Sequence, residues 1–385
     1  MRNVRRNPFK PTAGHTPPLL IGRDDDVDDF VEGLDNGPGA PSRLMRVTGA
    51  RGVGKTVLLS EFASIAQERG WEVIRESASK GLAARLVTRL HPQGDKGSYG
   101  FTISPSFNLA GVAGGSLGEF HYDSPQQMPL TLSDALRCRL DALEKKDAGL
   151  LIEIDEAQAA DRDDMIAISN AAQEMNTESR DYAFVFAGLP SMSSKWLNDE
   201  ATTFMRRADP HVLDDVPLDD VADAFEDTFR ASGMVLAGDA LHMAAEATYG
   251  YPFMIQLVGY HIWRTAMREH PDSSEVTVSD AERGIAKALA RLGDTVHGPE
   301  LDSLSPVDKT YLLAMAQDDG PSSTSEIAER MGKGLSYAGT YRTRLLEAQV
   351  IEECGYGKVD FAIPYLREYL REHAAFVRMS ADASD

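Results

Sequence analysis

The stretch "RVTGARGVGKTVLL", residues 46–59, places three glycines, a lysine and a threonine between two apolar runs. Glycine weakens helices and strands, so this cluster points to a backbone that must take positive φ or approach another group closely. Four residues fit the pattern Gly-x-x-x-x-Gly-Lys-Ser/Thr, namely Gly49, Gly54, Lys55 and Thr56. The pattern predicts a loop whose successive backbone N–H groups surround an anion at the start of a helix.

This loop has the residue types of a P-loop that binds ATP and Mg²⁺. The Lys55 ammonium would reach the β- and γ-phosphates, and the Thr56 hydroxyl would bind Mg²⁺. Backbone groups of the loop and the first helical turn would complete the cofactor-binding set: Gly49, Ala50, Arg51, Gly52, Val53, Gly54, Lys55, Thr56 and Val57. The alternative is a glycine-rich turn with a surface lysine.

The flanking segments support the P-loop interpretation. The segment "RLMRVTG" has the apolar content of a short buried strand, and "KTVLLSEFASIAQERG" has helical periodicity. The segment "WEVIRESA" returns to strand character. A strand–loop–helix–strand order predicts a parallel sheet with a right-handed crossover, so the predicted fold class is α/β with a P-loop NTPase sheet.

A second apolar run, "LLIEIDEAQ" at residues 150–158, ends in two acids. A strand of this kind would deliver Asp155 and Glu156 at the edge of the sheet where α/β proteins bind ligands. Asp155 would hold Mg²⁺, and Glu156 would orient or deprotonate the attacking water. The alternative is a helix N-cap, which the upstream P-loop disfavours.

Composition limits the possible architecture and location of the protein. A chain of 385 residues with 42% hydrophobic and 26% charged residues suggests a soluble protein of two or three domains. No apolar run approaches the roughly 20 residues that span a bilayer, and the two cysteines give no metal-ligand spacing, so we expect a cytoplasmic protein without a membrane partner.

The order of patterns predicts domain boundaries as well. The predicted parts are a disordered tail (1–17), a P-loop ATPase core (18–209) with an inserted hairpin (98–121), a lid of four helices (210–295), a linker (294–306) and a winged helix-turn-helix (300–378).

The segments "LLIGRDDDVDDF", "VTGARGVGKTVLL" and "LLIEIDEAQ" together resemble the AAA+ ATPases of the origin-recognition-like and STAND group. The resemblance implies a nucleotide bound between core and lid, with Ile21 and Arg23 beside the adenine and Pro252 in the lid turn. It also implies a homo-oligomer in which Arg206 or Arg207 acts on a neighbour's γ-phosphate. The alternatives are a solvated Arg23 and structural ion pairs for the other two arginines.

The chain departs from that group in two places. The group's lid often carries an arginine after its Gly-x-Pro turn, whereas "GYPF" places Phe253 there. The fourth strand often ends in a polar sensor residue, whereas residues 186–190 read "FAGLP". Both departures predict slow hydrolysis, with ATP binding itself acting as the switch. They also shift the resemblance toward the STAND branch.

The C-terminal region has a locally basic stretch in an acidic chain. The formal charge is −21, which argues against a protein coated in nucleic acid but leaves room for a basic face. Residues 330–346 contain no acid, and the predicted recognition helix and its preceding turn offer Lys333, Arg342 and Arg344 to double-stranded DNA. The alternative is a domain that packs against the lid or a partner protein.

These features favour an AAA+-type switch that couples Mg-ATP binding and slow hydrolysis to movement of a winged-helix domain acting on DNA. The alternative is a STAND-type signalling or scaffold protein whose winged helix makes intramolecular or protein contacts. A third reading is a transcriptional regulator whose P-loop domain only binds nucleotide.

Overall fold

The structure is a computed structural model, and it describes residues 6–12, 20–90, 131–236, 238–374 and 377. The hairpin predicted at residues 98–121 lies outside the described residues.

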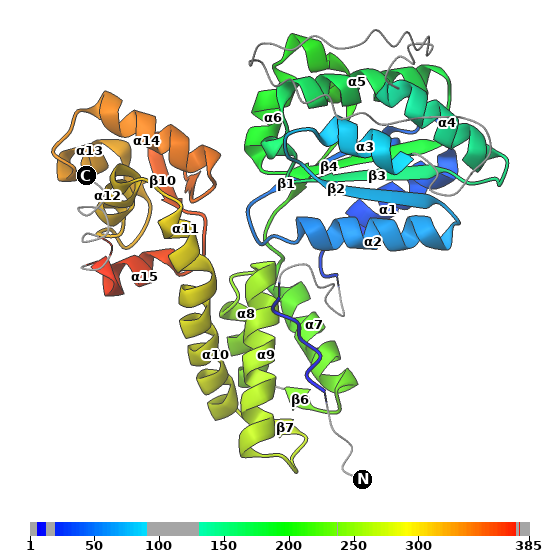
Figure 1. Ribbon diagram of the computed structural model, residues 1–385. Coiled ribbons are helices and arrows are strands. Elements are labelled where there is room, and N and C mark those ends of the chain that lie inside the picture. Colours follow the sequence, from blue (N-terminus) through cyan, green and yellow to red (C-terminus); the bar gives the residue numbers. More distant parts are fainter. Residues whose placement is uncertain (1–5, 13–19, 91–130, 237, 375–376, 378–385) are drawn as a thin grey trace, which may run out of the picture.

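The centre of the described chain is a parallel sheet with strand order β2-β3-β4-β1-β5 (Figure 1). Its strands are β1 (Leu44–Gly49), β2 (Glu72–Ser77), β3 (Leu150–Asp155), β4 (Tyr182–Gly188) and β5 (Asp209–Leu213). The predicted parallel α/β sheet is therefore confirmed. The prediction missed β5, and it ended the core at residue 209, where this strand begins. Strand β5 is a short edge strand with a proline and little alternation, so its sequence signal is weak.

Helices cover both faces of the sheet (Figure 1). One face carries α1 (Asp24–Asn36) and α2 (Lys55–Glu68), and the other carries α3 (Leu82–Leu90), α4 (Leu132–Glu144), α5 (Arg162–Thr177) and α6 (Pro190–Leu197). Short 3₁₀ segments are η1 (Pro41–Arg43), η2 (Ala157–Ala159) and η3 (Glu200–Arg207). Phe30 of α1 stacks on Phe62 of α2 with ring centroids 4.3 Å apart, and both side chains are fully buried.

The lid consists of α7 (Leu218–Ala231), α8 (Asp239–Glu246), α9 (Pro252–Glu269) and α10 (Val278–Leu292), with a small parallel pair of β6 (Val235–Leu236) and β7 (Glu275–Val276). These helices confirm the helical segments predicted there. Gly284 lets α10 approach α9 closely, because a Cβ at that position would lie 2.6 Å from the Ile262 Cα. Apolar side chains of the lid join those of α1, α2 and β1 in one continuous core.

The predicted linker at residues 294–306 is instead largely helical. The chain continues from α10 through a π-helical turn, η4 (Gly293–His297), into α11 (Gly298–Asp302). The glycine and proline that suggested a linker fall in the first turn of α11, where proline is well tolerated. His297 is 2% exposed beside the Pro364 carbonyl, and burial lowers its pKa to about 4, so the joint holds a neutral imidazole at neutral pH.

The C-terminal part has its own apolar core. Its elements are α12 (Pro306–Met315), β8 (Ser322–Ser323), α13 (Thr324–Arg330), α14 (Leu335–Glu347), β9 (Ile351–Glu353), β10 (Lys358–Phe361) and α15 (Leu366–Glu372). Its strands form an antiparallel sheet in the order β8-β10-β9. Three helices, α12, α13 and α14, thus precede the strand pair β9 and β10. Among the described residues, no helix is long and apolar enough to cross a membrane.

Residues 6–12, here called the N-terminal strap, differ from the predicted disordered tail. They run beside the lid helices (Figure 1), and Phe9 is only 2% exposed. Composition gives no information on a single aromatic anchor such as Phe9.

Candidate nucleotide-binding site

The P-loop joins the end of β1 to the start of α2. Gly52 and Gly54 take φ values of 79° and 96°, which other residues adopt only under strain. The Lys55 side chain is buried, and its Nζ donates to the carbonyl oxygens of Gly49 at 2.8 Å and Ala50 at 2.7 Å. Desolvation lowers the Lys55 pKa, while the nearby Glu156 and Asp155 carboxylates act in the opposite direction.

A hydroxyl and a carboxylate meet beside the loop. The Thr56 Oγ1 of α2 donates to the Asp155 Oδ2 at 2.7 Å, at the carboxyl end of β3. Asp155 also accepts the backbone N–H of Glu156 at 2.8 Å. Oxygen atoms of these types are the ligands that Mg²⁺ prefers, so the donor set fits the predicted metal.

Glu156 is held in place by Gln158, a residue that the sequence analysis did not single out. Glu156 has a positive φ of 54°, and the Gln158 Nε2 donates to its Oε2. The Gln158 Oε1 accepts the Leu189 N–H at 3.0 Å, and a Cβ on Gly188 would lie 2.5 Å from that oxygen. Gln158 thus ties Glu156 to the end of β4, where the "FAGLP" segment supplies no polar side chain of its own. The only sequence signal was a polar residue two positions after the acid.

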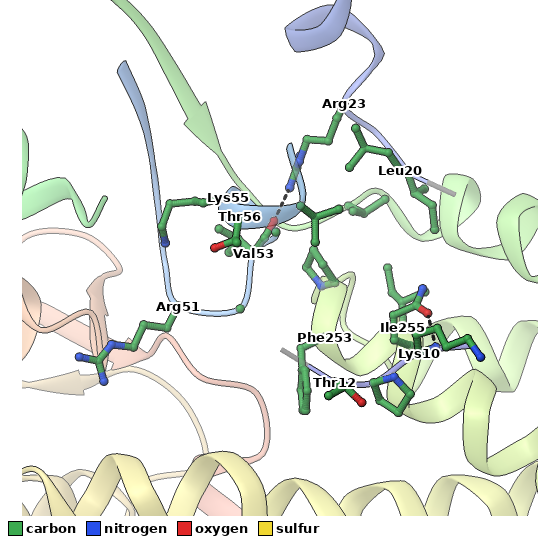
Figure 2. A pocket seen from close by; sticks show the side chains of 18 of the residues that line it. Lys10, Thr12, Leu20, Arg23, Arg51, Val53, Lys55, Thr56, Phe253 and Ile255 are labelled. Atoms are coloured by element: carbon green, nitrogen blue, oxygen red, sulfur yellow. Dashed lines mark hydrogen bonds between the residues drawn. The ribbon is translucent and has the colours of Figure 1, made fainter. Parts of the chain in front are cut away.

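A cavity of about 390 Å³ opens over the P-loop (Figure 2). Its lining combines P-loop residues with Glu156, the segment before α1, the lid and the N-terminal strap. The lining residues are Lys10, Pro11, Thr12, Leu20, Ile21, Arg23, Arg51, Gly52, Val53, Gly54, Lys55, Thr56, Val57, Glu156, Val216, Pro252, Phe253, Ile255 and Gln256. The structure therefore brings the P-loop together with Ile21, Arg23 and Pro252, as the sequence predicted.

Arg23 is buried rather than solvated, with only 8% of the residue exposed. Its Nη2 donates to the carbonyl oxygens of Val53 at 3.3 Å and Asp214 at 2.5 Å. Burial lowers its pKa, and the carboxylates of Asp26, Asp214 and Asp215 oppose this effect. The guanidinium therefore ties the P-loop backbone to the chain that follows β5.

Tyr251, at the start of the lid helix α9, contacts the P-loop from the other side. Its hydroxyl donates to the Arg51 carbonyl oxygen at 2.7 Å, and the side chain is buried. A Cβ on Gly52 would lie 2.0 Å from that hydroxyl oxygen, so only glycine fits there. Burial raises the Tyr251 pKa, which keeps the hydroxyl protonated as a donor. No pattern in the sequence indicates this contact.

The Arg51 side chain points away from the lid toward the C-terminal part. Its Nη1 lies 2.6 Å from the Glu300 Oε2 of α11 (Figure 2 shows the Arg51 side chain). The Arg51 side chain is 57% exposed, whereas that of Glu300 is 8% exposed. Glu300 lies in the segment predicted to be a linker, so this ion pair could not be foreseen.

Arg206 and Arg207 do not line the cavity. Both are exposed at the end of η3, where the Arg206 Nε donates to the Leu197 carbonyl oxygen at 2.6 Å and the Arg207 guanidinium lies 5.7 Å from the Phe204 ring centroid. Among the described residues neither arginine forms an ion pair, so the structural ion pairs considered as their alternative are not found there.

The basic residues predicted to bind DNA are distributed differently. Lys333 is exposed, whereas the Arg342 Nη2 lies 2.7 Å from Glu353 and the Arg344 Nη2 lies 2.9 Å from Asp308. Asp308 is buried and also caps the start of α12. Two of the three predicted DNA contacts are therefore engaged within their own domain.

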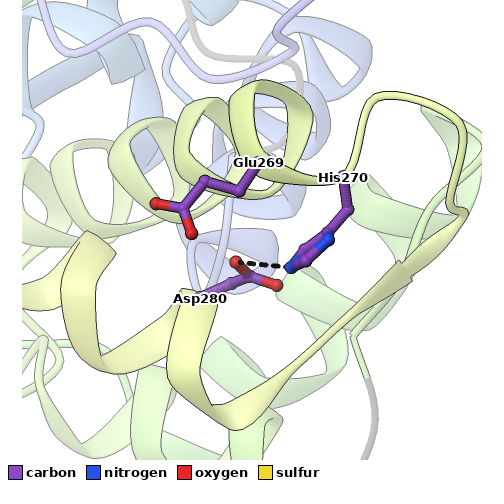
Figure 3. A group of neighbouring side chains, drawn as sticks. All are labelled: Glu269, His270 and Asp280. Carbon is purple, nitrogen blue, oxygen red and sulfur yellow. Dashed lines mark ion pairs between the residues drawn. The ribbon is translucent and has the colours of Figure 1, made fainter.

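One group in the described part of the chain has the spacing of a metal site: Glu269, His270 and Asp280 in the lid (Figure 3). Asp280 forms a capping box with Thr277 at the start of α10. Arg283 forms ion pairs with both Asp280 and Glu269. The carboxylates are already compensated, so this cluster is explained by helix capping and ion pairing.

Two parts of the chain match known protein families. Residues 19–185 match the family described as "AAA ATPase domain", and residues 294–370 match a domain of unknown function, DUF8462. No curated protein matches the chain.

Solved structures resemble the chain over nearly its whole length. The Walker-type ATPase paby2304 of Pyrococcus abyssi superimposes with a TM-score of 0.64 at 17% identity, covering 91% of this chain and 96% of that one. The ORC2 protein of Aeropyrum pernix gives a TM-score of 0.64 in its ADPNP-ADP complexes, at 13% identity and with coverage of 97% and 98%. Its ADP form gives 0.53 at 13% identity, with coverage of 97% and 99%.

These identities support the fold alone, whereas the family match supports the activity class. The chain therefore carries an AAA+-type P-loop ATPase domain, as the sequence resemblance implied. The winged-helix and STAND assignments stay predictions.

Two glycine variants test the contact between lid and P-loop. Gly52→Ala should lower the free energy of unfolding by about 3 kcal/mol, because the added methyl group meets Tyr251 in a backbone of positive φ. Gly54→Ala has positive φ but nothing within 4 Å of the new Cβ, so it should cost only about 1 kcal/mol. Urea unfolding measures both, and equal losses would contradict the close packing of Tyr251 on the loop.

Proposed function

We propose that the chain is a switch driven by ATP, which binds Mg-ATP between the P-loop and the lid, hydrolyses it slowly and thereby moves the C-terminal domain. One observation carries this proposal: the same short loop lines the cavity, is bonded by Tyr251 of the lid and is paired through Arg51 with Glu300. A ligand that changes this loop must therefore act on both neighbouring parts.

The cofactor-binding roles follow from the donor set. The P-loop amides from Gly49 to Val57 would surround the phosphates, and the Lys55 ammonium would leave its two carbonyl partners to bind them. Thr56 and Asp155 would hold Mg²⁺, which neutralises phosphate charge and orients the reacting group. Thr56 and Asp155 are already in contact, so metal binding would require only that the Thr56 hydroxyl proton bond to a different oxygen acceptor.

Hydrolysis would depend on Glu156, held by Gln158 at the edge of the cavity. From that position the carboxylate would accept a proton from the attacking water. Phe253 lines the cavity at the position where related lids carry an arginine, so the described lid residues that line the cavity include no cation to compensate developing charge. Slow turnover follows.

Arg206 and Arg207 are exposed and free of ion pairs within the described residues, which supports an action on a neighbouring subunit of a homo-oligomer.

Coupling to the C-terminal part would run through the Arg51–Glu300 ion pair. A triphosphate beside the loop competes with Glu300 for the guanidinium, since Arg51 also lines the cavity. The loss of Arg51 would leave a buried carboxylate without its partner, which is costly. Burial raises the pKa of Glu352 on β9, and the carboxylates of Asp215, Asp360 and Asp214 act in the same direction.

The lid also contacts the C-terminal part, at a place separate from the Arg51–Glu300 ion pair of the P-loop. The Tyr365 hydroxyl donates to the Ala247 carbonyl oxygen at 3.0 Å, and the Tyr365 ring meets Tyr249 edge to face with centroids 5.0 Å apart. This neutral contact does not depend on nucleotide charge, so it would serve as a pivot while the Arg51–Glu300 pair opens.

We infer that the C-terminal part is a winged helix, on the order α12, β8, α13, α14, β9 and β10. Its ion pairs favour the second candidate function, a STAND-like protein in which the winged helix makes internal contacts in the resting state. DNA binding would then follow release and would use Lys333 with Arg342 and Arg344, freed from Glu353 and Asp308.

Two site variants test the nucleotide site. Lys55→Ala should weaken ATP binding by at least about 100-fold, because the loop loses the cation that reaches the phosphates. Glu156→Gln should keep the affinity within about threefold and lower the hydrolysis rate by about 100-fold or more. Calorimetry and phosphate release measure the two effects. Unchanged ATP affinity in Lys55→Ala would overturn the proposed site.

The two native cysteines allow a direct test of coupling. Both are exposed, Cys138 on α4 of the core and Cys354 between β9 and β10, so fluorophores on them report the distance between core and C-terminal part. We expect ATP to change the energy transfer in the unaltered chain, and Glu300→Gln to shift the nucleotide-free chain toward the ATP-bound value. Glu347→Gln, an exposed acid on α14, is the control. Identical transfer in all states would contradict the proposed movement.

Charge reversal tests the DNA contact. The double variant Arg342→Glu with Arg344→Glu should weaken binding of the ATP-bound chain to a duplex at low salt by at least about tenfold. The double variant Arg264→Glu with Arg268→Glu makes the same change of net charge at exposed positions of α9 and should have a smaller effect. Fluorescence anisotropy measures both, and equal affinities of all three proteins would exclude this DNA face.

A further inference from the structure

The N-terminal strap is anchored in the lid by one aromatic side chain. The Phe9 ring lies 5.8 Å from Phe225 and 5.3 Å from Phe229, both on α7. On α9, a Cβ at Gly259 would lie 2.3 Å from the Phe9 ring, so the absence of a side chain at Gly259 leaves the space that the ring fills. The Phe9 side chain thus packs closely between α7 and α9 of the lid.

Hydrogen bonds fix the strap along α9 on either side of this anchor. The Asn7 Nδ2 donates to the Tyr260 carbonyl oxygen at 3.0 Å, and the Lys10 N–H donates to the Gln256 Oε1 at 3.0 Å. The Thr12 N–H donates to the Lys10 carbonyl oxygen at 2.8 Å, which turns the chain after the anchor. Backbone and side-chain contacts therefore set both the position and the direction of the strap.

The strap ends at the cavity, on the side away from the catalytic groups. Figure 2 shows Lys10 and Thr12 beside Phe253 and Ile255 of the lid, with Lys55 and Thr56 at the other side. Five lining residues, Leu20, Ile21, Val216, Phe253 and Ile255, are apolar, and Phe253 and Ile255 among them lie beside the strap. The phosphates belong at the P-loop, so the part of a nucleotide left for this side is the nucleoside, whose base has apolar faces and a polar edge.

We propose that the N-terminal strap is a wall of the nucleobase site and that it, with Gln256, determines how tightly the base is held. This inference rests on the proposed function, because it names a further part of the same site. The Lys10 N–H occupies the Gln256 Oε1, so the amide offers its NH₂ group to a ligand. A base that presents a ring nitrogen as an acceptor fits this donor.

The strap and the P-loop contribute to different parts of the ligand. The P-loop belongs to the core, between β1 and α2, whereas the strap is bonded to α7 and α9 of the lid. Loss of the strap should therefore remove affinity for the nucleoside and leave affinity for a bare triphosphate unchanged. A role in folding alone would lower both affinities together.

The test compares ATP with inorganic tripolyphosphate, each with Mg²⁺, by calorimetry on the full chain and three variants. A chain lacking residues 1–12 and the variant Phe9→Ala should each bind ATP at least about tenfold more weakly, while tripolyphosphate affinity stays within about twofold. A chain lacking residues 1–5 keeps the strap and should bind both ligands as the full chain does. The unchanged tripolyphosphate affinity also shows that the shortened chains are folded.

The possible results separate this inference from the proposed function. Unchanged ATP affinity without the strap would overturn the inference and leave the proposed function standing. Parallel losses for ATP and tripolyphosphate would also overturn it, because the strap would then act on the fold. A full chain that binds neither ligand would overturn the proposed function, and the inference with it.

Discussion

The structure depends on a loop whose backbone can exist only with glycine. Gly52 has a φ of 79°, and its missing side chain leaves room for the hydroxyl of Tyr251, which donates to the carbonyl oxygen of the preceding residue, Arg51. From the opposite side, Arg23 donates to the Val53 carbonyl oxygen. These contacts engage carbonyl oxygens of the loop, and its amide hydrogens are the groups that would bind an anion. A rigid loop of this kind is a preorganised site, so little ordering is needed when a phosphate binds.

The same arrangement explains how a small ligand could move a whole domain. The P-loop is in contact with the lid through Tyr251 and with α11 through Arg51 and Glu300. The joint between lid and C-terminal part is helical and contains the buried, neutral His297, so in the proposed switch it would transmit a rotation rather than absorb it. In the proposed switch, charge would drive the release, because within the described residues the buried Glu300 carboxylate forms an ion pair with Arg51 alone.

The sequence predicts the chemical centre better than its surroundings. The P-loop and the acids after β3 could be identified because local residue types and their spacing are dictated by the ligand itself. Gln158, Tyr251 and Glu300 act through contacts between elements far apart in the chain, and their own neighbours in sequence carry no pattern. The predictions for strand β5 and for the helical joint were wrong because proline and glycine do not distinguish these elements from a loop. Proline occurs in edge strands as well as in loops, and glycine and proline occur in the first turn of a helix as well as in linkers. Phe9 lies in a polar segment, and composition is averaged over the whole segment. The one aromatic residue that anchors the segment therefore gives no visible signal.

The most direct measurement is a crystal structure of the chain grown with Mg²⁺ and a slowly hydrolysed ATP analogue. The account predicts triphosphate density against the backbone N–H groups of residues 52–55, with the Lys55 ammonium turned from its carbonyl partners onto the phosphates and a metal ion between Thr56 and Asp155. An ordered P-loop without density there, or a nucleotide bound elsewhere on the chain, would contradict it.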